Sequence, residues 1–132
     1  MMRLNRLLAS LVATVLVFGA SPASALGYVN NRSDWLALTQ EARVGYVQAL
    51  NDSLNYSFVD DTLVDALAKK GRTDCLVAHN MTASTLVGYI TATYRDDKYA
   101  NFAPSAVYII LMGEYCRDYI NRARQEFNLG PQ

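Results

Sequence analysis

The run NFAPSAVYIILMGEYCRDYINRARQEF, residues 101–127, decides the fold class of this chain. Its apolar side chains recur every three or four positions, which is the period of an α-helix and not of a β-strand. Pro104 suits a first helical turn, where a proline removes no hydrogen bond. We predict one helix that begins between Asn101 and Pro104 and ends at Asn128 to Gly130. Its apolar stripe consists of Val107, Ile110, Leu111, Cys116, Ile120, Ala123 and Phe127.

Two more helices are predicted in the first half of the chain. The first covers about residues 34–55, with Ser33 as its N-cap and a bend near Thr39, which can cap a restart. The second begins at Asp60-Asp61-Thr62 and ends near Lys70, because Gly71 is typical of the residue that follows a helix.

A third upstream helix completes the expected fold. Residues 72–79 form a loop that carries Cys75, and Thr82 caps a helix that ends in the charged turn Arg95 to Lys98. The β-branched residues of 44–47 and 107–110 would also suit strands, but helical periodicity flanks both and no hairpin turn joins them. The sequence therefore predicts an all-α domain, with four to five antiparallel helices around one core.

Residues 1–25 have the three parts of a cleavable signal peptide. Arg3 and Arg6 supply the positive start, residues 7–18 form an apolar run, and Ala23-Ser24-Ala25 is a small-residue cleavage site. The apolar run of about 12 residues is shorter than the roughly 20 that a membrane-spanning helix needs. We expect export to the periplasm, a mature domain of residues 26–132, and no membrane attachment after cleavage.

The chain has two cysteines, Cys75 and Cys116, and both lie in the expected mature domain. Export places them in an oxidising compartment, where a disulfide is the usual state of such a pair. A metal or redox thiol pair is the rival interpretation, but there is no Cys-x-x-Cys spacing and only one histidine. We therefore expect one structural disulfide between Cys75 and Cys116.

Charge and residue types argue against several classes of function. Removal of Arg3 and Arg6 from the 12 basic residues leaves 10 against 12 acidic ones, a net charge of about −2. The chain has no basic run of the kind that binds nucleic acid. His79 is the only imidazole and no nucleophile elbow accompanies it, so we expect no catalytic residues, no metal ligands, no cofactor and no enzymatic activity.

The nine tyrosines all lie after residue 25, and six of them fall in the second half of the chain. Tyrosine combines a large apolar face with a polar tip, which suits both a small core and a protein interface. Both interpretations stay open at the level of sequence. The six are Tyr89, Tyr94, Tyr99, Tyr108, Tyr115 and Tyr119.

An ordered set of short motifs resembles a known family. The run GYVQALND, residues 45–52, is similar to a GYV-x-G-x-x-D helix, with Ala49 in place of the second glycine. Cys75, Thr82, Leu86-Val87, Tyr89-Ile90, Ala106 and Glu114-Tyr115-Cys116 then follow in the family's order. Over about residues 35–117 the chain resembles the type VI amidase immunity (Tai-type) family of small exported helical proteins.

The resemblance implies a function without chemistry. Members of that family protect a bacterium from peptidoglycan amidase toxins delivered by type VI secretion, and many of them are homodimers. By this resemblance the partner is an amidase, and the disulfide fastens the last helix to the loop before the third helix. The chain departs from the family at Tyr94-Arg95, where a proline is usual, so the following loop is expected to have its own shape.

Within that loop we expect a contact surface for a protein partner. Its polar and aromatic side chains offer directional bonds and apolar area, and the disulfide is expected to hold the flanking helices. The candidate contacts are Arg95, Asp96, Asp97, Lys98 and Tyr99.

The alternative function is a periplasmic acid-stress chaperone or a binding module of the same helical class. Such a chaperone is also small and helical with one disulfide, and it exposes apolar surface on acidification. This chain is only 18% charged, which is low for that class.

Overall fold

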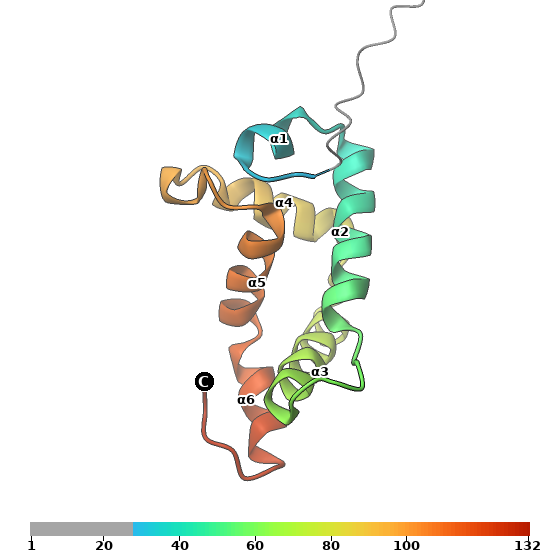
Figure 1. Ribbon diagram of the computed structural model, residues 1–132, viewed down its shortest axis with the longest axis vertical. Helices are drawn as coiled ribbons and strands as arrows, with labels where there is room; N and C mark the ends of the chain where they lie inside the picture. Colours follow the sequence, from blue (N-terminus) through green and yellow to red (C-terminus); the bar gives the residue numbers. More distant parts are fainter. Residues whose placement is uncertain (1–27) are drawn as a thin grey trace, which may run out of the picture.

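The computed structural model describes residues 28–132, so the expected signal peptide lies outside the described part of the chain. Residues 28–132 form six α-helices, one short 3-10 helix and no strand, which confirms the all-α class. None of these helices is long and apolar enough to cross a bilayer. The elements are α1 (Arg32–Ala37), α2 (Gln40–Asn55), α3 (Leu63–Ala78), α4 (Ala83–Thr93), η1 (Asp97–Tyr99), α5 (Pro104–Tyr115) and α6 (Arg117–Gln125) (Figure 1).

Threonines cap three of the helices. The hydroxyl oxygens of Thr39, Thr62 and Thr82 each accept a hydrogen bond from the backbone N–H three residues ahead, over 3.2, 3.2 and 3.1 Å. Each cap satisfies one of the N–H groups that a helix start leaves free. The predicted starts at Thr62 and Thr82 are confirmed. The single helix predicted over residues 34–55 is instead two, because Thr39 caps the separate helix α2, and the N-cap of α1 is Asn31 and not Ser33.

The predicted end of the second helix at Gly71 is wrong. α3 continues to Ala78, so Cys75 lies within a helix and not in a loop. Gly71 is buried, and a Cβ on it would lie 2.4 Å from the Cα of Ile120. Glycine is therefore required here because α6 packs directly against its backbone, and not because the helix ends.

The single helix expected over 101–127 is also divided. Cys116 has a φ of −99° and a ψ of 11°, outside helical values, so it ends α5 and precedes α6. The end of α5 and the start of α6 remain bonded through this residue, since the N–H of Cys116 donates to Met112 O and that of Ile120 donates to Cys116 O. The last part of the chain is thus two helices joined end to end (Figure 1).

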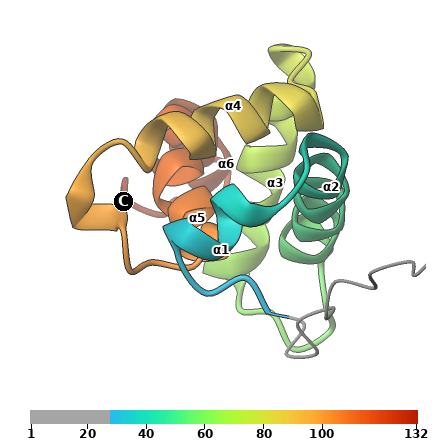
Figure 2. The ribbon, with the colours of Figure 1, turned by 90° about the horizontal axis from the view of Figure 1, so that it is seen from above.

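The helices enclose one core, with α4 lying across α2 and α5 instead of alongside them (Figures 1 and 2). The disulfide between Cys75 and Cys116 is confirmed and sits inside this core, with a Cα–Cα distance of 5.6 Å. Cys75 lies in α3 and not in a loop before α4 as expected, so the disulfide joins α3 to the α5–α6 junction. The largest fully buried side chains include Trp35, Tyr94, Tyr108, Ile90, Met112, Ile120, Val47 and Val107.

Candidate interaction surface

The connection between α4 and α5, residues 94–103, contains the five predicted contact residues and projects from the side of the molecule opposite α2 (Figures 1 and 2). Its first residue, Tyr94, is buried and donates its hydroxyl hydrogen to Phe102 O over 2.7 Å. Burial raises the pKa of Tyr94 to about 12. The two ends of the connection are therefore tied to each other through the core.

Arg32, at the start of α1, anchors the middle of the connection. Its guanidinium donates to Tyr94 O over 3.0 Å and to the Asp97 carboxylate over 2.7 Å. Its backbone N–H donates to Ala100 O over 3.0 Å. Because the Asp97 side chain is 89% exposed, the ion pair alone contributes at most about 1 kcal/mol, and the carbonyl contacts carry much of the anchoring.

A second, local set of contacts shapes the 3-10 helix. Asp96 accepts from the backbone N–H of Lys98, and the Lys98 ammonium lies 3.0 Å from the Asp96 carboxylate and 4.7 Å from the Tyr99 ring centroid. The bonds from Lys98 hold the pKa of Asp96 below its usual value, and Asp96 raises that of Lys98. Residues 96–99 are therefore ordered without help from the disulfide.

The five predicted contact residues are brought together, but they are not equivalent. Arg95, Asp96 and Lys98 are exposed, with Asp96 and Lys98 paired to each other. Asp97 is committed to Arg32, and Tyr99 is half-buried against the core. The expectation that the disulfide holds this connection is wrong, because it joins α3 to the α5–α6 junction while α1 anchors residues 94–100. The contacts of Arg32 with Tyr94 and Asp97 could not be predicted from the sequence, because these residues lie 62 and 65 positions further along the chain.

The tyrosines divide between core and surface, so the core interpretation is right for some of them and the interface interpretation stays a prediction for the others. Tyr94 and Tyr108 are fully buried, whereas Tyr89 and Tyr115 are exposed. The ring of His79 meets the rings of Tyr115 and Tyr119 edge-on, with centroids 5.3 and 5.7 Å away. His79 thus belongs to a surface aromatic cluster. Residues 28–132 contain no group of three or more His, Cys, Asp or Glu side chains suited to a metal ion.

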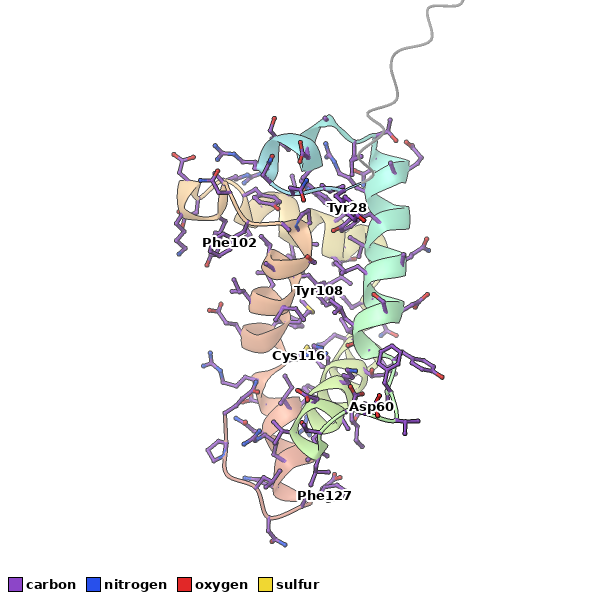
Figure 3. All side chains as sticks on the ribbon, viewed as in Figure 1. Tyr28, Asp60, Phe102, Tyr108, Cys116 and Phe127 are labelled. Atoms are coloured by element: carbon purple, nitrogen blue, oxygen red, sulfur yellow. A yellow bond between two sulfur atoms is a disulfide. The ribbon has the colours of Figure 1, made fainter. Side chains whose placement is uncertain are left out.

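The sequence reasoning missed an exposed apolar loop between α2 and α3. Tyr56, Phe58 and Val59 are all exposed, and Val59 has no measurable protection from solvent. The labelled Asp60 marks this loop on the α2 side in Figure 3, while Phe102 lies on the opposite side. The clue available in the sequence was a set of apolar residues between the end of one predicted helix, at residue 55, and the start of the next, at residue 60.

Lys69 organises that loop. Its ammonium donates to Tyr56 O over 3.0 Å and to both Asp61 carboxylate oxygens over 2.7 Å, and it lies 4.7 Å from the Phe58 ring centroid. The Lys69 and Asp61 side chains are each only 14% exposed. The largely enclosed pair of Lys69 and Asp61 therefore holds the loop in the shape that exposes its apolar side chains.

A cleft of about 670 Å³ lies between α2, α3 and the start of α4. This also was not expected, since residues 72–79 were assigned to a loop and not to the helix that forms one wall. Its lining residues are Val47, Gln48, Asn51, Asp52, Asn55, Thr73, Leu76, Val77, Asn80, Met81, Ala83 and Leu86.

Comparisons of the chain with protein-family models, with curated proteins and with solved structures gave no match.

Proposed function

We propose that this protein is a periplasmic immunity protein that binds and blocks a peptidoglycan amidase toxin delivered by type VI secretion. The observation that supports the proposal is the α4–α5 connection, in which Arg95, Asp96 and Lys98 are exposed on a backbone anchored by Arg32. The motif resemblance supplies the class of partner.

The geometry suits protein binding for two physical reasons. A loop that is already ordered loses little conformational entropy when it binds, so more of the contact energy appears as affinity. Charged and aromatic side chains on such a loop give directional bonds together with apolar area. Tyr99 and Phe102, whose ring centroids are 5.8 Å apart, supply the aromatic part.

The proposal requires that a neighbouring gene encodes a peptidoglycan amidase, and the test uses that enzyme together with the mature protein from Leu26. Wild-type protein is expected to bind that amidase and to stop its hydrolysis of purified peptidoglycan at equimolar concentration. The double variant Arg95→Glu with Lys98→Glu should bind at least tenfold more weakly, a loss of about 1.4 kcal/mol. Both side chains are exposed, but Lys98 also pairs with Asp96 and lies over the Tyr99 ring. Circular dichroism should show a retained fold, and amide exchange of residues 95–102 as slow as in the wild type shows that the loss of affinity comes from lost contacts and not from a loosened loop.

Arg117→Glu is the matched control. Arg117 is exposed at the first turn of α6, where a glutamate suits the helix dipole, and it lies outside the connection. Affinity should be unchanged in this variant. No binding by the wild-type protein would reject the immunity function, whereas equal binding by the double variant would place the contact surface elsewhere.

A chaperone remains the second candidate because of the apolar loop held by Asp61 and Lys69. Hydrogen bonds from Lys69 and from the Phe58 N–H lower the pKa of Asp61, so the pair persists to a lower pH than it would with an unperturbed aspartate. If the protein is a chaperone, circular dichroism at about pH 3 should show partial unfolding together with suppressed aggregation of a client protein. Retained helicity and no suppression would reject this function.

A further inference from the structure

We propose that the cleft between α2 and α3 binds an extended segment of another polypeptide that carries a basic side chain. This site is separate from the connection proposed to meet the amidase. Ala83, the first residue of α4, lines the cleft, whereas the connection follows Thr93, the last residue of the same helix. At 1.5 Å per residue, the two sites lie about 15 Å apart along α4.

The two walls of the cleft differ in chemistry. α2 contributes Gln48, Asn51, Asp52 and Asn55, whose spacing of three and four places them on one face of the helix. α3 contributes Thr73, Leu76 and Val77, which share a face in the same way, and Asn80 follows two residues after the end of this helix. Apolar side chains cover much of the remaining lining: Val47, Leu76, Val77, Met81 and Leu86.

The α2 wall of the cleft, which carries the amides of Gln48, Asn51 and Asn55, is partly fixed in position. Asn51 Oδ1 accepts from the Tyr108 hydroxyl over 2.7 Å and from Asn55 Nδ2 over 2.8 Å. Asn55 Oδ1 accepts from Arg72 Nε over 2.9 Å. These bonds leave the Nδ2 group of Asn51 as a donor with no partner among the described residues, and Gln48 and Asp52 likewise make no side-chain hydrogen bond there.

An extended backbone is the ligand that matches such a wall. A peptide presents alternating N–H and C=O groups, and side-chain amides can both donate to and accept from them. Gln48 to Asn55 spans about 10 Å of helix, which equals roughly three residues of extended chain. The apolar lining offers burial to the side chains of the same segment, and the volume lies within the range of ordinary ligand sites.

The charge of the cleft determines whether an anionic or a cationic ligand is favoured. Asp52 is the one charged residue among the lining residues, and it forms no ion pair within residues 28–132. An anionic ligand would meet this carboxylate with no compensating Lys or Arg, whereas a basic side chain would neutralise it. The lining also has no aromatic ring on which a sugar face could stack, which favours peptide over carbohydrate.

The experiment selects a phage-displayed library of random heptapeptides on the immobilised mature protein. Enriched peptides should share a Lys or Arg at one position and should shift the amide NMR signals of cleft residues. Isothermal titration should show that the peptides bind the double variant Gln48→Ala with Asp52→Asn at least tenfold more weakly than the wild type. Both substituted side chains are exposed, and circular dichroism should show an unchanged fold.

Glu41→Gln, in the first turn of α2 and outside the cleft, is the control and should bind the peptides as the wild type does. The proposal is overturned if no peptide is enriched, if enriched peptides lack a basic residue, or if the double variant binds them equally well. Chitotriose is tested in parallel. Larger shifts at the cleft with this sugar than with the best peptide would assign the site to carbohydrate instead.

Discussion

Gly71 of α3 packs directly onto the backbone of Ile120 in α6. A Cβ built on Gly71 would lie 2.4 Å from the Ile120 Cα and 2.7 Å from its N. Both atoms belong to the main chain, so no side-chain rotation can make room. α3 and α6 form the most extensive helix pair of the structure, and this contact sets how closely they approach.

Gly71→Ala should therefore destabilise the fold although alanine is the better helix former. Overpacking of a core contact costs about 1–3 kcal/mol, more than the 0.5–1 kcal/mol that alanine gains over glycine in a helix. Urea denaturation should show a net loss of unfolding free energy. Gly45→Ala and Gly88→Ala are the controls, since no atom lies within 4 Å of a Cβ at either position and both should be stabilising. Equal effects at all three glycines would contradict the packing argument.

Loss of the disulfide should weaken the fold strongly. Cys75 and Cys116 are 41 positions apart, and closing a loop of that size contributes roughly 4 kcal/mol in the chain-entropy model. The Cys75→Ala with Cys116→Ala variant should lose most of that amount in urea denaturation. Mass spectrometry of the unreduced wild-type protein should find the two cysteines linked, and two alkylated thiols would contradict the structure.

Arg32→Met should loosen the α4–α5 connection while the helices persist. It removes the donors to Tyr94 O and to the Asp97 carboxylate. Hydrogen bonds to charged groups contribute about 1.5–3 kcal/mol, so amide exchange in residues 95–102 should be about tenfold faster or more. Asp97→Asn keeps the Tyr94 contact and should have the smaller effect. Unchanged exchange in Arg32→Met would show that the connection is ordered by other contacts.

The α2–α3 loop should respond to acid in one direction. The pKa of Asp61 lies below its usual value of 3.8, mainly because Lys69 donates to it. A carboxyl whose pKa is lowered by folding stabilises the fold fully above its unfolded pKa and loses that contribution as the pH falls through its folded pKa. The difference in unfolding free energy between wild type and Asp61→Asn should be constant between about pH 5 and 7 and shrink below 3.8. A difference that grows in acid would exclude the pair as its source.

The mature N-terminus is expected at Leu26. Protein recovered from the periplasm of the producing cells should begin there by mass spectrometry, because Ala23-Ser24-Ala25 is the predicted cleavage site. Replacing Ala25 by a large residue such as phenylalanine should block cleavage and leave the longer form. An intact Met1 terminus in the wild-type mature pool would contradict the export prediction.

Local signals in the sequence were sufficient for the helix starts. The side chains of Thr62 and Thr82 bond only to residues three positions ahead, so the information for each cap is contained in a single turn. The all-α class follows equally from periodicity, because a face spaced at three and four is a local property of the chain.

The missed features depend on contacts between distant residues. Lys70-Gly71 has the pattern of a helix end, and only the approach of Ile120 shows why the glycine is needed in mid-helix. The anchoring of the α4–α5 connection depends on Arg32, a residue that its own local pattern places only in the polar segment before the first helix. The cleft was missed because it exists only when α3 extends beyond Gly71 to form a wall.

The buried disulfide makes a covalent ring of residues 75–116, and this ring contains α4, the exposed connection and α5. A single backbone cut anywhere within the ring opens it without dividing the molecule, since the two new ends remain joined through sulfur. A protease that nicks residues 95–99 would therefore release no fragment, and the nicked chain would migrate as one species on a gel without reductant. This exposed segment can be cut and still stay attached to the helices on either side of it.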